Sequence, residues 1–161
     1  MKKGFTMIEL IFVIVILGVL ASVAIPRLAA TRDDAEVAKA ATNLTTAVSD
    51  ITAYYTAKGH FKSGSTAAAK NVTFDKITNA LDKDGKLMVK GKTACVTVAL
   101  PTTVPTSGAV NITLTFTDSD AVCKTLKTLP GIKAMCGKSG DKDSVGQTCN
   151  IQVGGSGGIQ F

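Results

Sequence analysis

An apolar run near the start of the chain is the feature that most limits what it can fold into. No residue from Leu10 to Ile25 is charged, and the 21 residues from Phe5 to Ile25 contain Glu9 as their one ionisable side chain. As a helix rising about 1.5 Å per residue, this run is about 32 Å long, close to the roughly 30 Å hydrocarbon thickness of a bilayer. We therefore expect a helix that can span a membrane.

The residues on either side of the apolar run indicate which way it would cross. Lys2 and Lys3 precede it, and by the positive-inside rule they leave the N-terminus in the cytoplasm and everything after Pro26 outside. The cysteines agree with that placement, because they are even in number, lie in the exported part and lack the CxxC spacing of zinc and redox sites. We expect two disulfides, with all three pairings open, among Cys95, Cys123, Cys136 and Cys149.

Three interpretations of this N-terminal segment compete. A secretory signal peptide would end at the small residues of Ser22-Val23-Ala24. It gives no reason for Glu9, because a charge near the membrane interior costs on the order of 2 to 3 kcal/mol. A plain single-pass anchor would tolerate Glu9 near the interface, and the third interpretation gives the carboxylate a function.

The stretch KKGFTMIELIFVIVILGVLASVAIP closely resembles the N-terminus of type IV prepilins and pseudopilins. In that family a short basic leader ends in glycine, a prepilin peptidase cuts after it, and the new N-terminal residue, usually phenylalanine, is N-methylated. The resemblance implies a leader of residues 1–4, cleavage between Gly4 and Phe5, and methylation of the Phe5 amine. It also implies a filament-core or transmembrane helix over residues 5–26.

Three further residues of this segment fall at positions that the family uses in assembly. The resemblance implies that Glu9 neutralises the N-terminal amine of a neighbouring subunit, and pairing in a low-dielectric setting offsets much of the desolvation cost of a carboxylate. Geometry alone leaves open an amine of the same chain. Gly18 and Pro26 match the family's helix-weakening residues, so the helix between them either melts partly during assembly or carries an ordinary proline kink.

The sequence after Pro26 continues as an amphipathic helix, which we expect over residues 27–59. Lys58 and Gly59 are typical of a helix end, since a cation favours the last turn and glycine the position after it. Together with the apolar run this gives one helix from about Phe5 to Lys58. Its apolar residues are spaced alternately by four and three: Val37, Ala41, Leu44, Val48, Ile51 and Tyr55.

Residues 60–161 are expected to form a small α+β head. Hydrophobic spacing and turn signals predict two helices and four antiparallel strands lying against the C-terminal half of the long helix. Asp118 or Ser119 is expected to cap the second helix, and Pro130-Gly131 to end it. The expected elements are a helix over 74–81, strands over 86–89, 93–100 and 110–116, a helix over 120–129 and a strand over 148–153.

The resemblance also bears on the disulfides. Type IV pilins commonly have a C-terminal loop bounded by a disulfide, and Cys136 with Cys149 resembles it. We favour this pair, closing a surface loop, together with Cys95 and Cys123, tying a strand to a helix. Each bond would contribute about 2 to 4 kcal/mol, mostly by restricting the unfolded chain.

Catalysis and metal binding find little support in the residues. His60, the one histidine, has no recognisable nucleophile or carboxylate partner and is expected at the surface. The DKDG of residues 82–85 and the pair Asp141 and Asp143 hint at calcium, but the first lacks the third ligand of an EF-hand loop because Lys86 stands there, and both are more simply turns. We expect no enzyme and no cofactor, with Asp141 and Asp143 as the remaining metal candidates.

The net charge of +6 falls by two to +4 once Lys2 and Lys3 leave with the leader. Repeated along a filament, lysines near the chain's end would attract DNA or acidic surfaces. A solvated basic face is the simpler interpretation, since no aromatic residues interleave for base stacking. These lysines are at positions 124, 127, 133, 138 and 142.

The resulting hypothesis is a structural subunit of a type IV pilus or a closely related filament, polymerising through its N-terminal helix. Its implied partners are copies of itself, a prepilin peptidase, and a pilus assembly platform with its ATPase, with the inner membrane before assembly and the cell surface afterwards. Two alternatives stay open: a pseudopilin of a type II secretion system, whose major members resemble one another in holding calcium in a C-terminal loop, and a membrane-anchored minor pilin acting as adhesin or DNA receptor.

Overall fold

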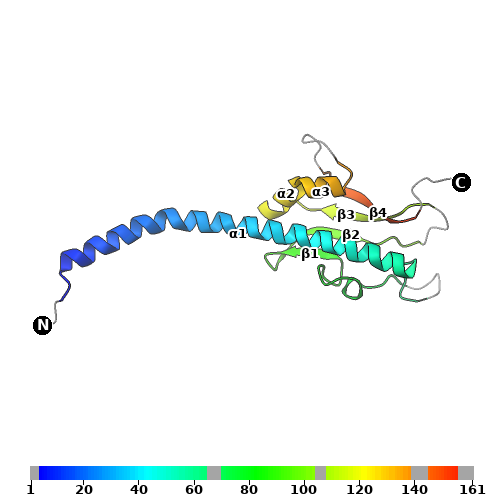
Figure 1. The fold of residues 1–161 in the computed structure, drawn as a ribbon, viewed down its shortest axis with the longest axis horizontal. Helices are drawn as coiled ribbons and strands as arrows, with labels where there is room; N and C mark the ends of the chain where they lie inside the picture. The colour runs from blue at the N-terminus through cyan, green and yellow to red at the C-terminus, as the bar shows by residue number, and fades with distance from the viewer. Residues whose placement is uncertain (1–3, 65–69, 104–107, 139–144, 156–161) are drawn as a thin grey trace. The chain divides into compact units, whose positions relative to one another are not determined.

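The structure is a computed structural model of the chain, and it describes residues 4–64, 70–103, 108–138 and 145–155, apart from the side chains of residues 29 and 30 (Figure 1). A long N-terminal helix and a four-stranded antiparallel sheet give the expected α+β, pilin-like fold. The chain divides into two compact units, Met1–Ala35 and Glu36–Phe161. The elements are α1 (Met7–Lys58), η1 (Phe74–Lys76), β1 (Lys86–Val89), β2 (Thr93–Ala99), β3 (Val110–Phe116), α2 (Ala121–Thr128), α3 (Pro130–Met135) and β4 (Thr148–Gly154).

Helix α1 runs without a break through Gly18 and Pro26. Its end agrees with the prediction: Lys58 is the last helical residue, and Gly59 follows with a φ of 72°, a left-handed conformation that glycine adopts without a Cβ penalty. The Gly59 N–H donates to the Tyr55 carbonyl at 2.7 Å, which satisfies one of the carbonyls left open at a helix end.

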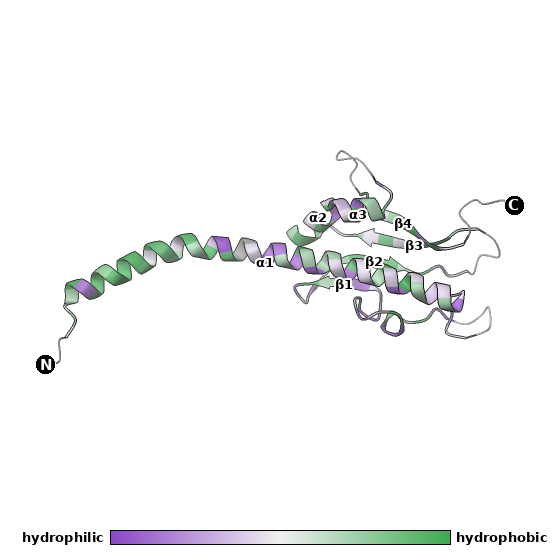
Figure 2. Ribbon diagram, viewed as in Figure 1, coloured by the Kyte–Doolittle hydropathy of each residue, from purple (hydrophilic) through white to green (hydrophobic). Residues whose placement is uncertain are grey.

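Residues 10–25 of α1 have apolar side chains on all sides, and Figure 2 shows the N-terminal part of the helix as mostly hydrophobic. None of these large side chains is buried by the chain itself: Ile25 is 66% exposed, and even Ile16, the most covered of them, is 43% exposed. A helix that is apolar all round and uncovered requires a lipid or protein environment from outside the chain.

The second unit contains the sheet and the hydrophobic core. Its strands lie in the order β1-β2-β3-β4 and every neighbouring pair is antiparallel. Burial alternates along β3, where Val110, Ile112, Leu114 and Phe116 face the core and the residues between them are more exposed. This alternation is what a sheet with one solvated face requires. The four strands agree with the predicted ranges to within one residue.

The C-terminal half of α1 lies along this sheet in Figure 1 and supplies one side of the core. The predicted apolar stripe is confirmed, although small residues beside it are buried as deeply as the large ones. The fully buried residues of this half are Val37, Ala40, Leu44, Ala47 and Ile51, and the partly buried ones packed against the same core are Ala41, Val48, Tyr54 and Tyr55.

The helix predicted over residues 74–81 is wrong, because only the 3₁₀ turn η1 forms there. Phe74 enters the core and is 8% exposed, as the spacing suggests. Thr78 is also buried, and its hydroxyl accepts the Ala80 N–H at 3.1 Å. Such a local side-chain bond offers the backbone an alternative to the next helical turn, so the helix does not continue.

The N-terminal cap of α2 is Asp120, and the prediction of Asp118 or Ser119 is wrong. One Asp120 carboxylate oxygen, Oδ1, accepts the Val122 N–H at 2.8 Å. The Asp118 carboxylate instead accepts from the Lys127 ammonium, at 2.9 and 3.0 Å. The Asp118 carboxylate is thus engaged by Lys127, nine residues away, and Asp120 caps the helix instead. The residue spacing does not reveal this ion pair.

Pro130 ends one helix but begins another, α3, which sequence reasoning missed. Proline fits the first helical position, where its missing N–H would have no partner and its fixed φ is already helical. Ile132 of α3 is 2% exposed and belongs to the core. The stop signal at Pro130-Gly131 was therefore a boundary between two helices.

Two disulfides brace the second unit, and they are the two favoured above. Cys95 of β2 is bonded to Cys123 of α2, with the Cα atoms 4.9 Å apart. Cys136, which follows α3, is bonded to Cys149 of β4, with the Cα atoms 5.6 Å apart. Both bonds join a strand to the α2–α3 region, so they hold this region against the sheet.

Candidate functional site

The candidate site is the start of α1, where the residues singled out for processing and assembly lie. Gly4, Phe5 and Thr6 precede the helix without regular structure and are all exposed, so the peptide bond between Gly4 and Phe5 is accessible. A Cβ added at Gly4 would meet nothing within 4 Å. Packing within the described part of the chain therefore does not require glycine at this position.

Glu9 closes a capping box with Thr6. The Thr6 N–H and hydroxyl both donate to Glu9 Oε2, at 2.8 and 2.7 Å, and the Glu9 N–H donates to Thr6 Oγ1 at 3.4 Å. These contacts satisfy orphan donors of the first helical turn and hold the carboxylate at the helix start. The T-x-x-E spacing of residues 6–9 is the sequence signal for this arrangement, and sequence reasoning missed it.

The two oxygens of the Glu9 carboxylate have different surroundings. Both hydrogen bonds to the carboxylate end on Oε2, and within the described part of the chain no group donates to Oε1. A cavity of about 260 Å³ beside the carboxylate is lined by Phe5, Leu10, Val13 and Ile14. Glu9 thus presents one open acceptor oxygen next to an apolar surface, an arrangement that favours an incoming cation with an apolar flank.

Gly18 and Pro26 lie farther along the same helix, about 14 Å and about 26 Å from Glu9 at 1.5 Å per residue. A Cβ added at Gly18 would meet nothing within 4 Å, so its small size is not used for packing inside the chain. The structure therefore gathers Gly4, Phe5 and Glu9 at the helix start and leaves Gly18 and Pro26 separate from them.

One helix in the described part of the chain, α1, is long and apolar enough to cross a membrane by length and composition. Its most apolar 18-residue window has a mean hydropathy of 2.9, and none of that window is buried. The first 25 residues match the prokaryotic N-terminal methylation motif. This motif is the prepilin-type signal of type IV pilins and pseudopilins, and it includes Gly4, Phe5, Glu9 and Gly18.

The methylation motif points to a structural protein that is processed as a pilin-type precursor, and with the apolar helix it fits membrane anchoring before assembly. It ends before Pro26 and does not extend into the second unit. No curated protein and no solved structure matches the chain.

In the acidic turn before β1, residues 82–85, the Asp82 side chain accepts hydrogen bonds from the backbone. Asp82 Oδ1 accepts the N–H groups of Asp84 and Lys86, at 3.0 and 2.7 Å. Gly85 has a φ of 78°, and an added Cβ there would overlap the Phe74 ring. Residues 82–85 therefore form the turn that the simpler interpretation expects. Among the residues that the structure describes, no group of three or more His, Cys, Asp or Glu could hold a metal ion.

The remaining candidates for binding are the acidic pair Asp141 and Asp143 and the C-terminal lysines. Asp141 and Asp143, with Lys142, lie outside the described residues. Of the other C-terminal lysines, Lys127 is half-buried and paired with Asp118, so its charge is partly neutralised within the head. The exposed ones, at positions 124 and 138, are carried by α2 and by the segment after α3.

Proposed function

We propose that this chain is a filament subunit of the type IV pilus class. A prepilin peptidase cuts it between Gly4 and Phe5, the new Phe5 amine is methylated, and the subunit waits in the inner membrane through residues 5–26. Assembly then transfers this apolar helix from lipid into the core of a surface filament of identical subunits. The head, residues 60–161 with the amphipathic half of α1, forms the outer surface.

The observation that carries the proposal is the coincidence of three properties in one short segment. The methylation motif covers residues 1–25, residues 7–25 within it belong to an uncovered apolar helix, and the one carboxylate in the motif keeps Oε1 open. A signal peptide needs only the apolarity, and a plain anchor needs neither the motif nor the carboxylate. A subunit that docks repeatedly needs all three.

Cleavage creates a charged donor that can bind Glu9 Oε1. In the precursor the Phe5 nitrogen is an uncharged amide, and after the cut it becomes an ammonium at the end of an apolar helix. When a second subunit brings that ammonium to Glu9 Oε1, the two charges neutralise each other in a low-dielectric surrounding, where their attraction is far larger than in water. A carboxylate left unpaired there is unfavourable by several kcal/mol, so docking in the wrong register is penalised.

The test is the assembly of Glu9→Ala and Glu9→Gln subunits in the producing cell. Both variants should be cleaved and anchored like the wild type, while the amount of subunit in sheared surface material falls at least tenfold. Asp34→Ala is the matched control, since Asp34 is an exposed acid on the same helix and lies outside the motif. Its sheared fraction should match the wild type.

Two results would contradict the proposal. If the mature chain begins after residue 24 and is released in soluble form, the N-terminal segment is a signal peptide. If the chain begins at Phe5 but the sheared fraction holds no subunit even for the wild type, the protein is an anchored binding protein that does not polymerise. Intact mass measurement of membrane and sheared fractions distinguishes these cases.

A further inference from the structure

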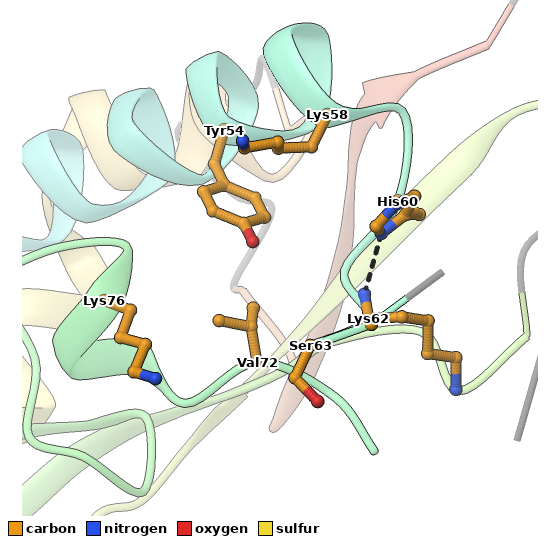
Figure 3. A pocket seen from close by; sticks show the side chains of 8 residues that line it. Tyr54, Lys58, His60, Lys62, Ser63, Val72 and Lys76 are labelled. Carbon is orange, nitrogen blue, oxygen red and sulfur yellow. Dashed lines mark hydrogen bonds between the residues drawn. The ribbon is translucent and has the colours of Figure 1, made fainter. Parts of the chain in front are cut away.

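A cavity of about 330 Å³ opens at the C-terminal end of α1, within the second unit and away from the assembly site (Figure 3). Side chains from α1, from the segment after it and from η1 converge on this cavity. Its lining is rich in positive charge and contains no Asp or Glu among the described residues. The lining residues are Tyr54, Lys58, His60, Lys62, Ser63, Gly64, Val72 and Lys76.

The cavity has a rigid wall and floor. Tyr54 is stacked on Phe61, with ring centroids 6.2 Å apart and planes within 9° of parallel, and Phe61 is only 3% exposed. Val72 forms the buried base, and its N–H donates to the Phe61 carbonyl at 2.8 Å. In Figure 3 the Tyr54 hydroxyl points down toward Val72. A hydroxyl donor is thereby held in place in the cavity.

The charged groups at the rim differ in how far they are already satisfied. The Lys62 ammonium donates to the Thr102 carbonyl at 2.6 Å and points away from the cavity. Lys58 and Lys76, in contrast, make no hydrogen bond or ion pair with any residue that the structure describes. Two ammonium groups on the lining thus remain available to attract an anion.

His60 adds a further donor to this arrangement. Its Nδ1 accepts the Lys62 N–H at 3.2 Å, which leaves Nε2 as the ring nitrogen that can donate to a ligand. The Ser63 hydroxyl already donates to the Lys70 carbonyl at 3.1 Å, so the cavity offers the His60 ring, the Tyr54 hydroxyl and two ammonium groups. This combination suits a tetrahedral oxyanion with several acceptor oxygens.

We propose that this cavity binds a phosphate group carried on a small ester. Its volume corresponds to about eleven water molecules at roughly 30 Å³ each, more than the five heavy atoms of a phosphate ion need. The remaining space beside the Tyr54 ring receives the part of the ligand to which the phosphate is attached. The negative end of the α1 dipole opposes an anion here, and Lys58 in the last helical turn offsets it.

The experiment titrates the full-length mature chain, held in an uncharged detergent, with inorganic phosphate, glucose 6-phosphate and glucose at low ionic strength. Binding is followed by calorimetry and by the phosphorus NMR shift. Glucose 6-phosphate should bind, and glucose should not. Equal affinity for inorganic phosphate would identify the free ion as the source of the phosphate group, and tighter binding of glucose 6-phosphate would identify the ester.

The double variant Lys58→Gln/Lys76→Gln should weaken binding of glucose 6-phosphate about tenfold or more, since a hydrogen bond to a charged group contributes at least a factor of ten. Lys83→Gln/Lys92→Gln is the matched control, because both lysines are exposed in the same unit, neither lines the cavity, and the net charge is the same. It should change affinity less than twofold.

Tyr54→Phe keeps the stack on Phe61 and removes the hydroxyl, so it should weaken binding by a smaller factor with no change in thermal unfolding. The proposal is overturned if neither phosphate compound binds to the wild type. It is equally overturned if the two double variants weaken binding to the same extent, since the attraction would then be a general effect of net charge.

Discussion

The two halves of α1 are both rich in apolar residues, but the large apolar side chains are exposed in the first half and buried or partly buried in the second. Leu17 lies in the first half and is 58% exposed, whereas Leu44 lies in the second half and is fully buried. The second half pairs an apolar stripe with a polar face and covers the stripe with the sheet; the first half is apolar all round and is covered by nothing in the chain. Apolarity alone therefore does not indicate a core: its distribution around the helix decides whether the partner surface is internal or external.

The sharpest way to test this difference is the same substitution in both halves. Leu44→Ala should destabilise the head by about 3 to 5 kcal/mol, because it removes a fully buried side chain and leaves a cavity. Leu17→Ala should leave the unfolding of the head unchanged. Thermal and denaturant unfolding of the detergent-solubilised chain, followed by near-UV circular dichroism, measures both effects. An equal loss in the two variants would show that the halves do not differ as described.

The second test asks how much of the head's stability comes from its disulfides instead of its core. Replacing Cys95 and Cys123 by alanine should cost about 3.5 kcal/mol, and replacing Cys136 and Cys149 about 3 kcal/mol, from the loop lengths that the bonds close. The sequence separations are 28 and 13 residues. The first pair should cost more for a second reason, since both cysteines are 1% exposed and their removal disturbs the core. Denaturant midpoints of the two double variants, compared without reductant, check the order.

The smallest effect concerns the carboxylate that caps helix α2 of the head. The Val122 N–H bond and the nearby Lys90 ammonium hold the pKa of the Asp120 carboxyl below its usual range. A carboxyl with a lowered pKa stabilises the fold above its unfolded-state pKa, and this contribution disappears as the pH falls through the folded-state pKa. Asp120→Ala should therefore lower the melting temperature slightly at pH 7, with the difference shrinking in acid. A difference that stays constant with pH would assign the effect to packing.

Much of the fold could be predicted from the sequence because its signals are local and repeated. The stripe from Val37 to Tyr55 recurs over about five turns, and β3 alternates over seven residues, so a single exception does not obscure the pattern. The helix end at Lys58 and Gly59 rests on residue types whose preference is intrinsic to the backbone.

The parts that could not be predicted depend on single contacts. Asp120 rather than Asp118 caps α2 because Lys127, nine residues away, takes the Asp118 carboxylate. The helix after Phe74 stops because Thr78 is buried and its hydroxyl accepts a hydrogen bond from the Ala80 N–H. Hydrophobic periodicity predicts neither outcome. In each case two local arrangements are possible, and contacts in the folded chain determine which one forms.

The candidate site shows the same division. Glu9 stands out in the sequence as a charge in an apolar run, but its use of one oxygen for Thr6 requires the geometry of the first helical turn. The basic cavity could not be anticipated either, because Lys58 and Lys76 are 18 residues apart in the sequence and line one cavity only in the folded chain.

The uneven use of the Glu9 carboxylate has a consequence for the ends of a filament. On the proposed function each subunit contributes one ammonium and one open acceptor oxygen, and the two lie at different points of its surface, so the contact between subunits is heterologous and repeats without closing. Every interior subunit is then satisfied on both sides. The two ends are chemically distinct, since one terminates in an unmatched Phe5 ammonium and the other in an unmatched Glu9, and such a filament has a built-in direction.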